Sequence, residues 1–595
     1  MQIALAQINP TLGDFEGNYQ KILEYCAKAN EDGADIVVFP ELAISGYNPE
    51  DLALRKTFMD ESKHWLNQLV IASDKWNVAI VVGAVFLNPE PTDEEIRREL
   101  EAKNPKRKQP TLTERLAALD QCFAEAEYEA SVSSITGKIE HKPCNASFLI
   151  HKGHILHQHN KIALPTDGPS DERRVFAPGK TLETIRFKDQ GIGLLVCDDL
   201  WVNRIYSVEK CNLIIAINAA PFTVDQYKTR IKLLKYQAAS YQADIVYVNM
   251  VGCQDSMVYD GGSMVIMQDG TILHQSAFFE EKMDMITLYD KSTKPMNANP
   301  DDFGALAKNS DADDDKIPEY DGTELIYKAL LLALKDHLRK NNLTDVVIGL
   351  SGGIDSTMTA VLAIDALGKD RVHLVTIPPR YTSEEILKDT KEFLAGVGME
   401  ATNIPIEPMF EESIKTTKVG ELAQQSLQSR IRGLILMALS NEHGYMLLAT
   451  GNKSEIAVGL GALYGDLNGE YNLLKDLYKT DVYELALWRN KLGPVIPKSI
   501  MIKALTTELA PNQKDTGTLP DYRILDEILR SYIEEGMTCE TIAKRNKSSS
   551  DLTHELLALV QKAEFKRHQT PIGPKIRKRS FDLDWRMPIS NKFVG

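Results

Sequence analysis

A glycine turn in the second half of the chain carries the residues best suited to hold a phosphate group. An apolar run at 345–350 is followed by Ser-Gly-Gly-Ile-Asp-Ser at 351–356, where a helical pattern begins. Backbone N–H groups at glycines and at a helix N-terminus bind phosphate. Ser351 and Ser356 add hydroxyl donors, and Asp355 is suited to a bridging Mg²⁺. A plain strand–helix turn is the alternative, but it does not explain why serines, glycines and an aspartate coincide here.

This string resembles the SGGxDS signature of N-type ATP pyrophosphatases, which cut ATP to AMP and pyrophosphate while they adenylate an acceptor. The sequence GxxxxGK[ST] occurs nowhere in the chain, so the loop is not a Walker A loop. The resemblance implies that Gly349, Gly352 and Gly353 bind ATP together with the two serines and the aspartate. Several families share the signature, so it predicts the chemistry and leaves the acceptor open.

Further strings in residues 320–595 resemble those of NAD synthetases and indicate the acceptor. They lie at 428–433, 436–441, 449–455, 463–466, 474–476, 479–480, 508–513, 519–520 and 565–569. Each charged residue in them, taken singly, is more often part of a surface ion pair. Their order along the chain is what favours a nucleotide site.

The NAD synthetase resemblance also implies roles for individual side chains. Asp355 and Glu455 would bind Mg²⁺ on the ATP phosphates, as expected for carboxylates and a hard cation. Thr450 and Lys479 would contact ATP, and the lysine would neutralise charge on departing pyrophosphate. Arg430 would lie near the nucleotide substrates. On the acceptor side the resemblance places Asp466.

Three residues of the first half could together hydrolyse an amide. Cys197 and Glu41 each end an apolar strand, and Lys161 lies in the string His-Asn-Lys-Ile-Ala-Leu-Pro at 159–165. A free thiol has a pKa of about 8.5, so a nucleophilic cysteine needs a base or a cation nearby. Taken singly, a strand-end cysteine is usually a core residue and a strand-end glutamate usually caps a helix. The combination is what indicates catalysis.

The combination resembles the Glu-Lys-Cys triad of the nitrilase, or carbon–nitrogen hydrolase, superfamily. That resemblance implies that Cys197 attacks the side-chain amide of glutamine and that Glu41 carries the thiol proton to departing ammonia. Lys161 and the backbone N–H of Asp198 would stabilise the tetrahedral oxyanion. Glu172 resembles the second glutamate of the superfamily, which would orient the lysine and the water.

Two segments depart from the pattern of related amidase domains. Thr166-Asp167-Gly168 stands where relatives often have Asn-Tyr-Gly, and Ala219-Ala220 stands where relatives usually offer serine to the substrate. Both positions concern recognition of glutamine. Free ammonia therefore remains an alternative nitrogen source.

The elements that position these residues indicate two α/β domains. Strand candidates at 3–8, 36–39, 78–86, 146–151, 193–197, 213–218, 245–249 and 263–267 alternate with helical stretches. We predict an N-terminal αββα nitrilase-like sandwich over 1–289, with a charged helical insertion at about 90–141. An acidic linker at 290–320 leads to a C-terminal Rossmann-like parallel-sheet ATP pyrophosphatase domain over 321–595. That domain should open with an amphipathic helix at 325–338.

Composition excludes several other classes of protein. The chain has 595 residues and a net charge of −16, which disfavours nucleic-acid binding. It lacks the apolar run of about 18–20 residues that crosses a bilayer, and its N-terminus is unlike a signal peptide. Its seven cysteines are widely spaced without a CxxC pair, which suits free thiols in the cytoplasm.

Together the two halves resemble glutamine-dependent NAD synthetases. The resemblance implies an enzyme, a ligase, that converts deamido-NAD(+), ATP and L-glutamine into NAD(+), AMP, pyrophosphate and glutamate, and a homo-oligomer. An ammonia-dependent synthetase and an enzyme that amidates another acid remain alternatives. A catalytically silent nucleotide-binding or scaffolding protein is disfavoured because Cys197, Asp355 and Glu455 are all present.

Overall fold

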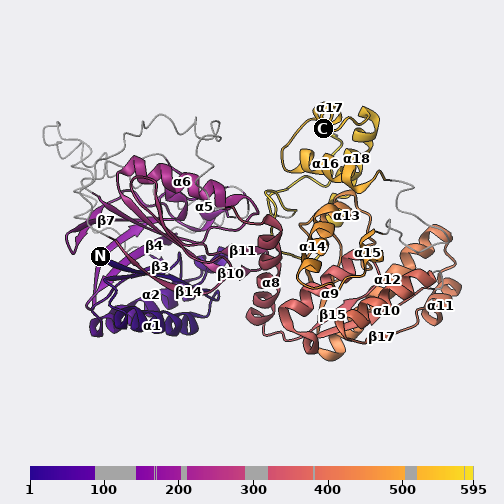
Figure 1. The fold of residues 1–595 in the computed structure, drawn as a ribbon, viewed down its shortest axis with the longest axis horizontal. Helices are drawn as coiled ribbons and strands as arrows, with labels where there is room; N and C mark the ends of the chain where they lie inside the picture. Colours follow the sequence, from indigo (N-terminus) through magenta and orange to yellow (C-terminus); the bar gives the residue numbers. More distant parts are fainter. Residues whose placement is uncertain are drawn as a thin grey trace, which may run out of the picture.

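The structure, a computed structural model, consists of two α/β bodies side by side (Figure 1). It describes residues 1–87, 142–166, 168, 170–202, 211–288, 319–379, 382–502, 519–581 and 583–593. The predicted insertion at about 90–141 lies outside the described residues. Most of the predicted linker and the string at 508–513 also lie outside them.

Most of the described strands of the first half form two sheets of six strands each, and two more form a separate hairpin. In order, one sheet contains β14 (Lys282–Thr287), β1 (Gln2–Gln7), β2 (Ile36–Val38), β3 (Ala79–Phe86), β4 (Cys144–His151) and β5 (His154–Asn160). The other contains β13 (Ile272–Gln275), β12 (Met264–Ile266), β9 (Asp244–Asn249), β8 (Leu213–Asn218), β7 (Gln190–Val196) and β6 (Thr184–Phe187). Apolar side chains of both sheets, such as Leu5, Val81 and Leu194, form the core between them.

Helices cover the outer faces of this sandwich (Figure 1). α1 (Phe15–Glu31) and α2 (Lys56–Ala72) lie on one side, and α6 (Gln226–Tyr241) lies on the other. α5 (Glu172–Val175) packs against η1 (Glu50–Leu54), and Val175 belongs to the apolar cluster of α1 and α2. α1 begins where the Asp14 side chain accepts the N–H of Gly17, and it buries Ile22 and Cys26. The short helices are η1 (Glu50–Leu54), η2 (Ser73–Lys75) and η3 (Cys197–Trp201). The predicted αββα sandwich is confirmed.

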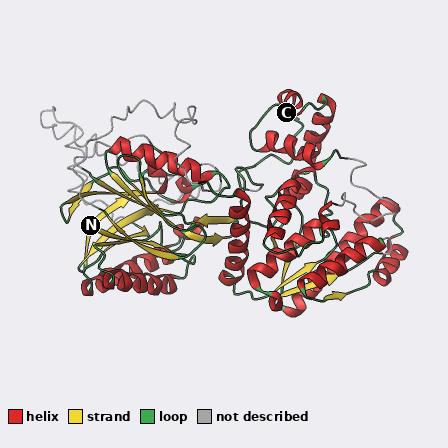
Figure 2. Ribbon diagram, in the orientation of Figure 1, coloured by secondary structure: helices red, strands yellow, loops and turns green. Residues whose placement is uncertain are grey.

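The second half is built on a parallel sheet, which runs β17 (Ala401–Asn403), β16 (Val372–Thr376), β15 (Val346–Gly349), β18 (Met446–Ala449) and β19 (Tyr471–Asn472). Helices surround it (Figure 2), as a parallel sheet with two buried faces requires. They are η6 (Lys369–Arg371), α9 (Ile354–Leu367), α10 (Glu384–Val397), α11 (Glu407–Thr417), α12 (Glu421–His443), α13 (Lys453–Val458), α14 (Lys479–Lys491) and α15 (Lys498–Ile502). The predicted parallel-sheet domain is confirmed.

A helical group and an extended segment complete the second half. The group comprises α16 (Tyr522–Ile533), α17 (Cys539–Asn546), α18 (Ser550–Lys562) and α19 (Glu564–Arg567). The segment that follows is fixed to Asp476, whose Oδ2 accepts the backbone N–H groups of Ile576 and Arg577 at 2.8 and 2.7 Å. The hydroxyl of Ser580 donates to the same oxygen at 2.6 Å. The Lys453 ammonium pairs with the other oxygen at 2.8 Å.

The two bodies meet at α8 (Gly322–Lys340) and a hairpin formed by β10 (Val251–Gln254) and β11 (Met257–Asp260). The hairpin reaches out of the first body and ends against α8, the first described helix of the second (Figures 1 and 2). α8 is the amphipathic helix predicted at 325–338. None of the helices in the described part of the chain has the length and hydrophobicity needed to cross a bilayer.

Candidate active sites

The loop between β15 and α9 keeps the shape that a phosphate needs. Gly352 has a φ of +82°, a left-handed conformation that favours glycine. A Cβ atom at this position would lie 2.7 Å from the Ile386 side chain, so any other residue would force its neighbours to shift. The backbone N–H of Ser351 donates to Oγ of Ser356 at 3.1 Å, and the N–H of Gly353 donates to Oγ of Ser351 at 3.3 Å. The two serines therefore brace the turn at the start of α9.

A buried lysine joins two carboxylates beside this loop. The Lys479 ammonium pairs with Oδ2 of Asp355 and, at 3.4 Å, with Oε1 of Glu455. Asn452, which caps α13 and accepts the N–H of Glu455 at 3.0 Å, donates to Oδ1 of Asp355 at 3.1 Å. Burial raises the pKa of Glu455 to about 7, with Lys479 opposing the shift. For Lys479, burial disfavours the charge, but Asp355 and Glu455 raise its pKa above the ordinary value.

A cavity of about 270 Å³ opens over the loop. Nine of the predicted binding residues line it: Gly349, Ser351, Gly352, Gly353, Asp355, Ser356, Thr450, Glu455 and Asp466. Lys479 is not among the lining residues and instead contacts two of the lining carboxylates. Arg430 does not line the cavity either, and its Nε donates to the carbonyl of Leu463 at 3.2 Å.

The sequence did not point to Arg432, the arginine that does line this cavity. Its guanidinium pairs with Oδ1 of Asp466 at 3.2 Å, and Oδ2 of Asp466 accepts the N–H of Ala462 at 3.3 Å. Residues two apart on a helix face different directions. Arg430 and Arg432 of α12 therefore cannot both point into the cavity, and helical spacing alone does not say which one does.

The donor set at Asp355 and Glu455 fits a magnesium ion. Both carboxylates line the cavity and reach the same ammonium group, and carboxylate oxygen is the ligand that Mg²⁺ prefers. Within the described ranges, no group of three or more histidine, cysteine, aspartate or glutamate side chains gathers as a metal centre. Phosphate oxygens and water would therefore supply the remaining ligands.

In the first half, Cys197 lies at the turn where β7 ends. Its φ of +43° is unusual for a residue with a side chain, and such outliers gather at functional sites. Burial, together with the carboxylates of Asp198 and Glu41, raises the pKa of the thiol well above its ordinary value. The resting sulfur is therefore protonated, and it would need a base to act as a nucleophile.

Lys161 is fully buried and binds three carboxylates at once. Its ammonium lies 3.0 Å from Oε1 of Glu41, 2.8 Å from Oε1 of Glu172 and 2.8 Å from Oδ2 of Asp198. Burial opposes its charge, but the three carboxylates raise its pKa well above the ordinary value. Lys161 is therefore a permanent, fixed cation, and the structure gathers the other three predicted catalytic residues around it.

The Glu41 carboxylate is held at both oxygens. Oε1 accepts from the side-chain amide of Asn145 at 2.7 Å as well as from Lys161, and Oε2 accepts the backbone N–H of Ala219 at 2.9 Å. Burial raises the pKa of Glu41 to about 7, while Lys161 opposes the shift. A base with a pKa near the working pH is well suited to proton transfer.

The sequence patterns did not indicate several other residues that belong to this site. Tyr47 donates its hydroxyl to Oε1 of Glu172 at 2.8 Å, whereas Oε2 of Glu172 is buried with no hydrogen-bond partner in the described part of the chain. Asp199 accepts the N–H groups of Ile162 and Ala163 at 2.9 and 2.8 Å, and that of Val196 at 3.1 Å. It thus ties the cysteine turn to the chain that carries the lysine. In the sequence, only its position two residues after Cys197 could have marked Asp199 as part of this site.

Fold and sites define a two-part enzyme in which an amidase domain precedes a nucleotide domain. Two family models match the chain: carbon–nitrogen hydrolase over residues 2–98 and 112–291, and NAD synthase over 326–570. The chain belongs to the family of glutamine-dependent NAD(+) synthetases.

Relatives that match over their full length support this family assignment. Glutamine-dependent NAD(+) synthetase of Thermotoga maritima is 36% identical, covering 100% of this chain and 99% of the relative. The Aquifex aeolicus protein of the same name is 35% identical over 100% of both chains. Among solved structures, glutamine-dependent NAD(+) synthetase from Acinetobacter baumannii, in complex with ADP, matches with a TM-score of 0.68 and 30% identity. That match covers 99% of this chain and 98% of the other.

Proposed function

We propose that the chain amidates deamido-NAD(+) to NAD(+), with ATP as the energy source and glutamine as the nitrogen donor, and that ammonia passes from one site to the other. Glutamine-dependent NAD(+) synthesis is the activity of its family, and the enzyme is a ligase. The observation that carries the proposal is that one chain holds both a Cys197 cluster and a phosphate-binding loop. An amidase alone would not need the second site.

In the amidase half, Cys197 is the nucleophile and Glu41 the base. Glu41 accepts the thiol proton as sulfur bonds to the amide carbon of glutamine, and it returns the proton to nitrogen as the carbon–nitrogen bond breaks. Water then cleaves the thioester and releases glutamate. The fixed cation of Lys161 and the backbone N–H of Asp198 stabilise the oxyanion in both steps.

Glu172 has two tasks in this proposal. Its Oε1 accepts from Lys161 and Tyr47 and so fixes the position of the cation. Its buried Oε2 has no hydrogen-bond partner among the described residues, and an unpaired buried carboxylate oxygen is costly. An N–H group of the substrate or a water molecule would satisfy that oxygen during the reaction.

In the synthetase half, the loop at 351–356 holds the ATP phosphates. The carboxylate of deamido-NAD(+) attacks the α-phosphorus, pyrophosphate leaves, and ammonia then displaces AMP from the adenylated carbonyl and loses a proton. Asp355 and Glu455 would hold Mg²⁺, which screens phosphate charge when it is bound. Lys479 keeps the two carboxylates together, and Thr450 and Asp466 face the nucleotides from across the cavity.

We also propose a cytoplasmic homo-oligomer. Every cysteine that the structure describes is a free thiol, which suits a reducing compartment. The homo-oligomer is what the resemblance of the two halves to this family implies. Light scattering of the purified protein tests this, and a monomeric mass at micromolar concentration would exclude the oligomer.

The decisive experiment follows nitrogen into NAD(+). The purified enzyme is given deamido-NAD(+), ATP and amide-labelled glutamine or labelled ammonium, and the products are weighed by mass spectrometry. Cys197→Ala should use ammonium and not glutamine, whereas Cys211→Ala, a matched thiol in the same domain, should use both. Glutamine use by Cys197→Ala would show that the nucleophile is elsewhere. Ammonium use alone by the wild type would favour an ammonia-dependent synthetase.

A further inference from the structure

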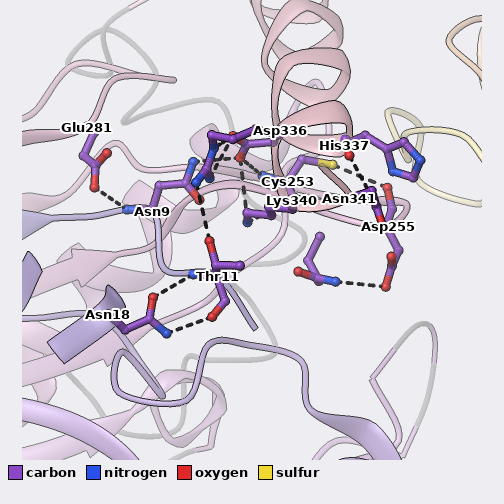
Figure 3. A network of polar contacts seen from close by, with 12 residues as sticks. Asn9, Thr11, Asn18, Cys253, Asp255, Glu281, Asp336, His337, Lys340 and Asn341 are labelled. Carbon is purple, nitrogen blue, oxygen red and sulfur yellow. Dashed lines mark hydrogen bonds and ion pairs between the residues drawn. The ribbon is translucent and has the colours of Figure 1, made fainter. Parts of the chain in front are cut away.

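Two side chains of α8 bind the main chain of Cys253 from outside the hairpin (Figure 3). Oδ2 of Asp336 accepts the N–H of Cys253 at 2.7 Å, and the Lys340 ammonium donates to the Cys253 carbonyl at 2.8 Å. The same aspartate oxygen accepts the side-chain amide of Asn9 at 2.7 Å. Asp336 and Lys340 are one helical turn apart, so together they occupy the polar edge of β10 as a neighbouring strand would.

This contact is buried and closely fitted. The side chains of Asp336 and Lys340 are only 5% and 6% exposed, and their charged atoms lie 3.8 Å apart. At Gly252, with a φ of +127°, an added Cβ atom would lie 2.8 Å from the Asp336 carboxylate and would also clash with Asn9. A buried charge without its partners is strongly destabilising. The helix and the hairpin are therefore held in one relative position.

The other strand of the hairpin leads to the amidase site. Gly252 pairs with Tyr259 of β11, and the buried ring of Tyr259 packs edge-on against Tyr47 with centroids 6.0 Å apart. Tyr47 in turn donates its hydroxyl to Glu172, which holds Lys161. A chain of direct contacts thus runs from the edge of α8 to the catalytic cation.

The same helix is also fixed to the sheet of the second half. The imidazole of His337 stacks on Tyr471 of β19 with centroids 4.2 Å apart, and the Tyr471 hydroxyl donates to the carbonyl of Asp255 in the hairpin turn at 3.3 Å. The next residue, Asn472, donates to the carbonyl of Gly451 at 2.8 Å, directly beside Thr450. The hairpin turn therefore contacts both α8 and the strand that leads to the ATP cavity.

We propose that Asp336 and Lys340 are positioning residues for glutamine hydrolysis, which act on Glu172 from the synthetase half through the β10–β11 hairpin. This inference rests on the proposed function, because it assigns the amidase reaction to the first half. It deepens that function by making docking of the two halves a requirement for the amidase geometry. A purely structural interface would instead support both reactions equally.

The test compares two reactions of the full-length enzyme. Asp336→Ala should lower kcat for glutamate release by at least about fivefold, while ammonium-driven NAD(+) formation stays within about twofold of wild type. Asp365→Ala is the matched control, since Asp365 bonds Tyr327 and Arg489 wholly within the second half. The control should leave the ratio of the two activities unchanged.

Further variants keep the test decisive. Asp336→Asn retains an acceptor for Cys253 and should restore part of the glutaminase rate. Should Asp336→Ala fail to fold, Lys340→Met, which removes only the donor to the Cys253 carbonyl, should lower the same ratio. An unchanged ratio in these variants, or an equal loss of both reactions, would overturn the inference. Failure of the proposed function would look different, because the wild type itself would then form no NAD(+).

Discussion

The backbone N–H of Ala219 donates a 2.9 Å hydrogen bond to Oε2 of Glu41, although 178 residues separate the two. This contact uses only the main chain of Ala219. The sequence departs from related amidase domains at this position, where serine is usual, yet any residue other than proline could make the same bond. The departure therefore leaves the orientation of the base unchanged.

Replacing Glu41 by glutamine should remove glutamine-dependent activity and spare the ammonium-dependent reaction. The amide cannot accept the thiol proton, and its NH₂ group would face the Lys161 or Ala219 donors. We expect glutamate release to fall by about 10²–10⁴-fold. Glu281→Gln, which changes a partly exposed acid paired with Lys21, serves as the control. A Glu41→Gln enzyme that hydrolyses glutamine at the wild-type rate would mean that another group is the base.

The pH dependence of glutamine hydrolysis should report Glu41. Its pKa is raised to about 7, mainly by burial, so the ionised form that accepts the thiol proton is lost as the pH falls through about 7. The kcat/KM for glutamine should therefore decline on the acidic side of neutrality. A stopped assay of glutamate at a series of pH values measures this, and an acidic limb near the ordinary glutamate pKa of about 4.3 would contradict it.

Replacing Asp355 by asparagine should abolish synthesis from either nitrogen source. The change removes one of two carboxylates that pair with the buried Lys479, and breaking such a pair typically costs about 3–5 kcal/mol. NAD(+) formation should fall by at least about 100-fold, whereas glutamate release persists. Asp370→Asn, an exposed acid on η6, is the control. Equal loss of both reactions would point to global unfolding, which thermal melting would reveal.

The variants Gly352→Ala and Gly368→Ala should distinguish a loss of folding stability caused by backbone strain from a loss of ATP binding. Both glycines have a positive φ, +82° and +84°, so each substitution should cost about 1–3 kcal/mol of folding stability. A Cβ at 352 would meet Ile386 at 2.7 Å, but nothing lies within 4 Å of one at 368. Only Gly352→Ala should therefore raise KM for ATP. Similar KM values in the two variants would remove the loop from the ATP site.

Buried strands were the part of the fold that sequence could predict. The run at 213–218 coincides with β8, because its apolar residues are buried on both faces. β5 was missed because it is an exposed edge strand that carries histidines instead of an apolar run. β10 and β11 were missed since each has only four residues, and Gly252 breaks any pattern of alternation.

The site was predictable where residues follow strands directly and unpredictable where distant segments meet. Cys197 and Glu41 were found because each follows a strand, β7 in one sheet and β2 in the other, and packing of the two sheets brings these residues close together. Tyr47 reaches the same cluster from a loop and Asn145 from the start of β4, and no local pattern marks either residue. Arg432 was overlooked in favour of Arg430 because orientation on a helix depends on its packing.

The segment bound to Asp476 sets an order in which the two halves can fold while the chain is being made. Its partners at 576, 577 and 580 emerge 100 residues or more after the aspartate itself. Domains fold as units while the chain is being made, the N-terminal one first. The amidase half can thus begin to fold early, whereas Oδ2 of Asp476 in the nascent synthetase half lacks these three partners until translation has passed residue 580.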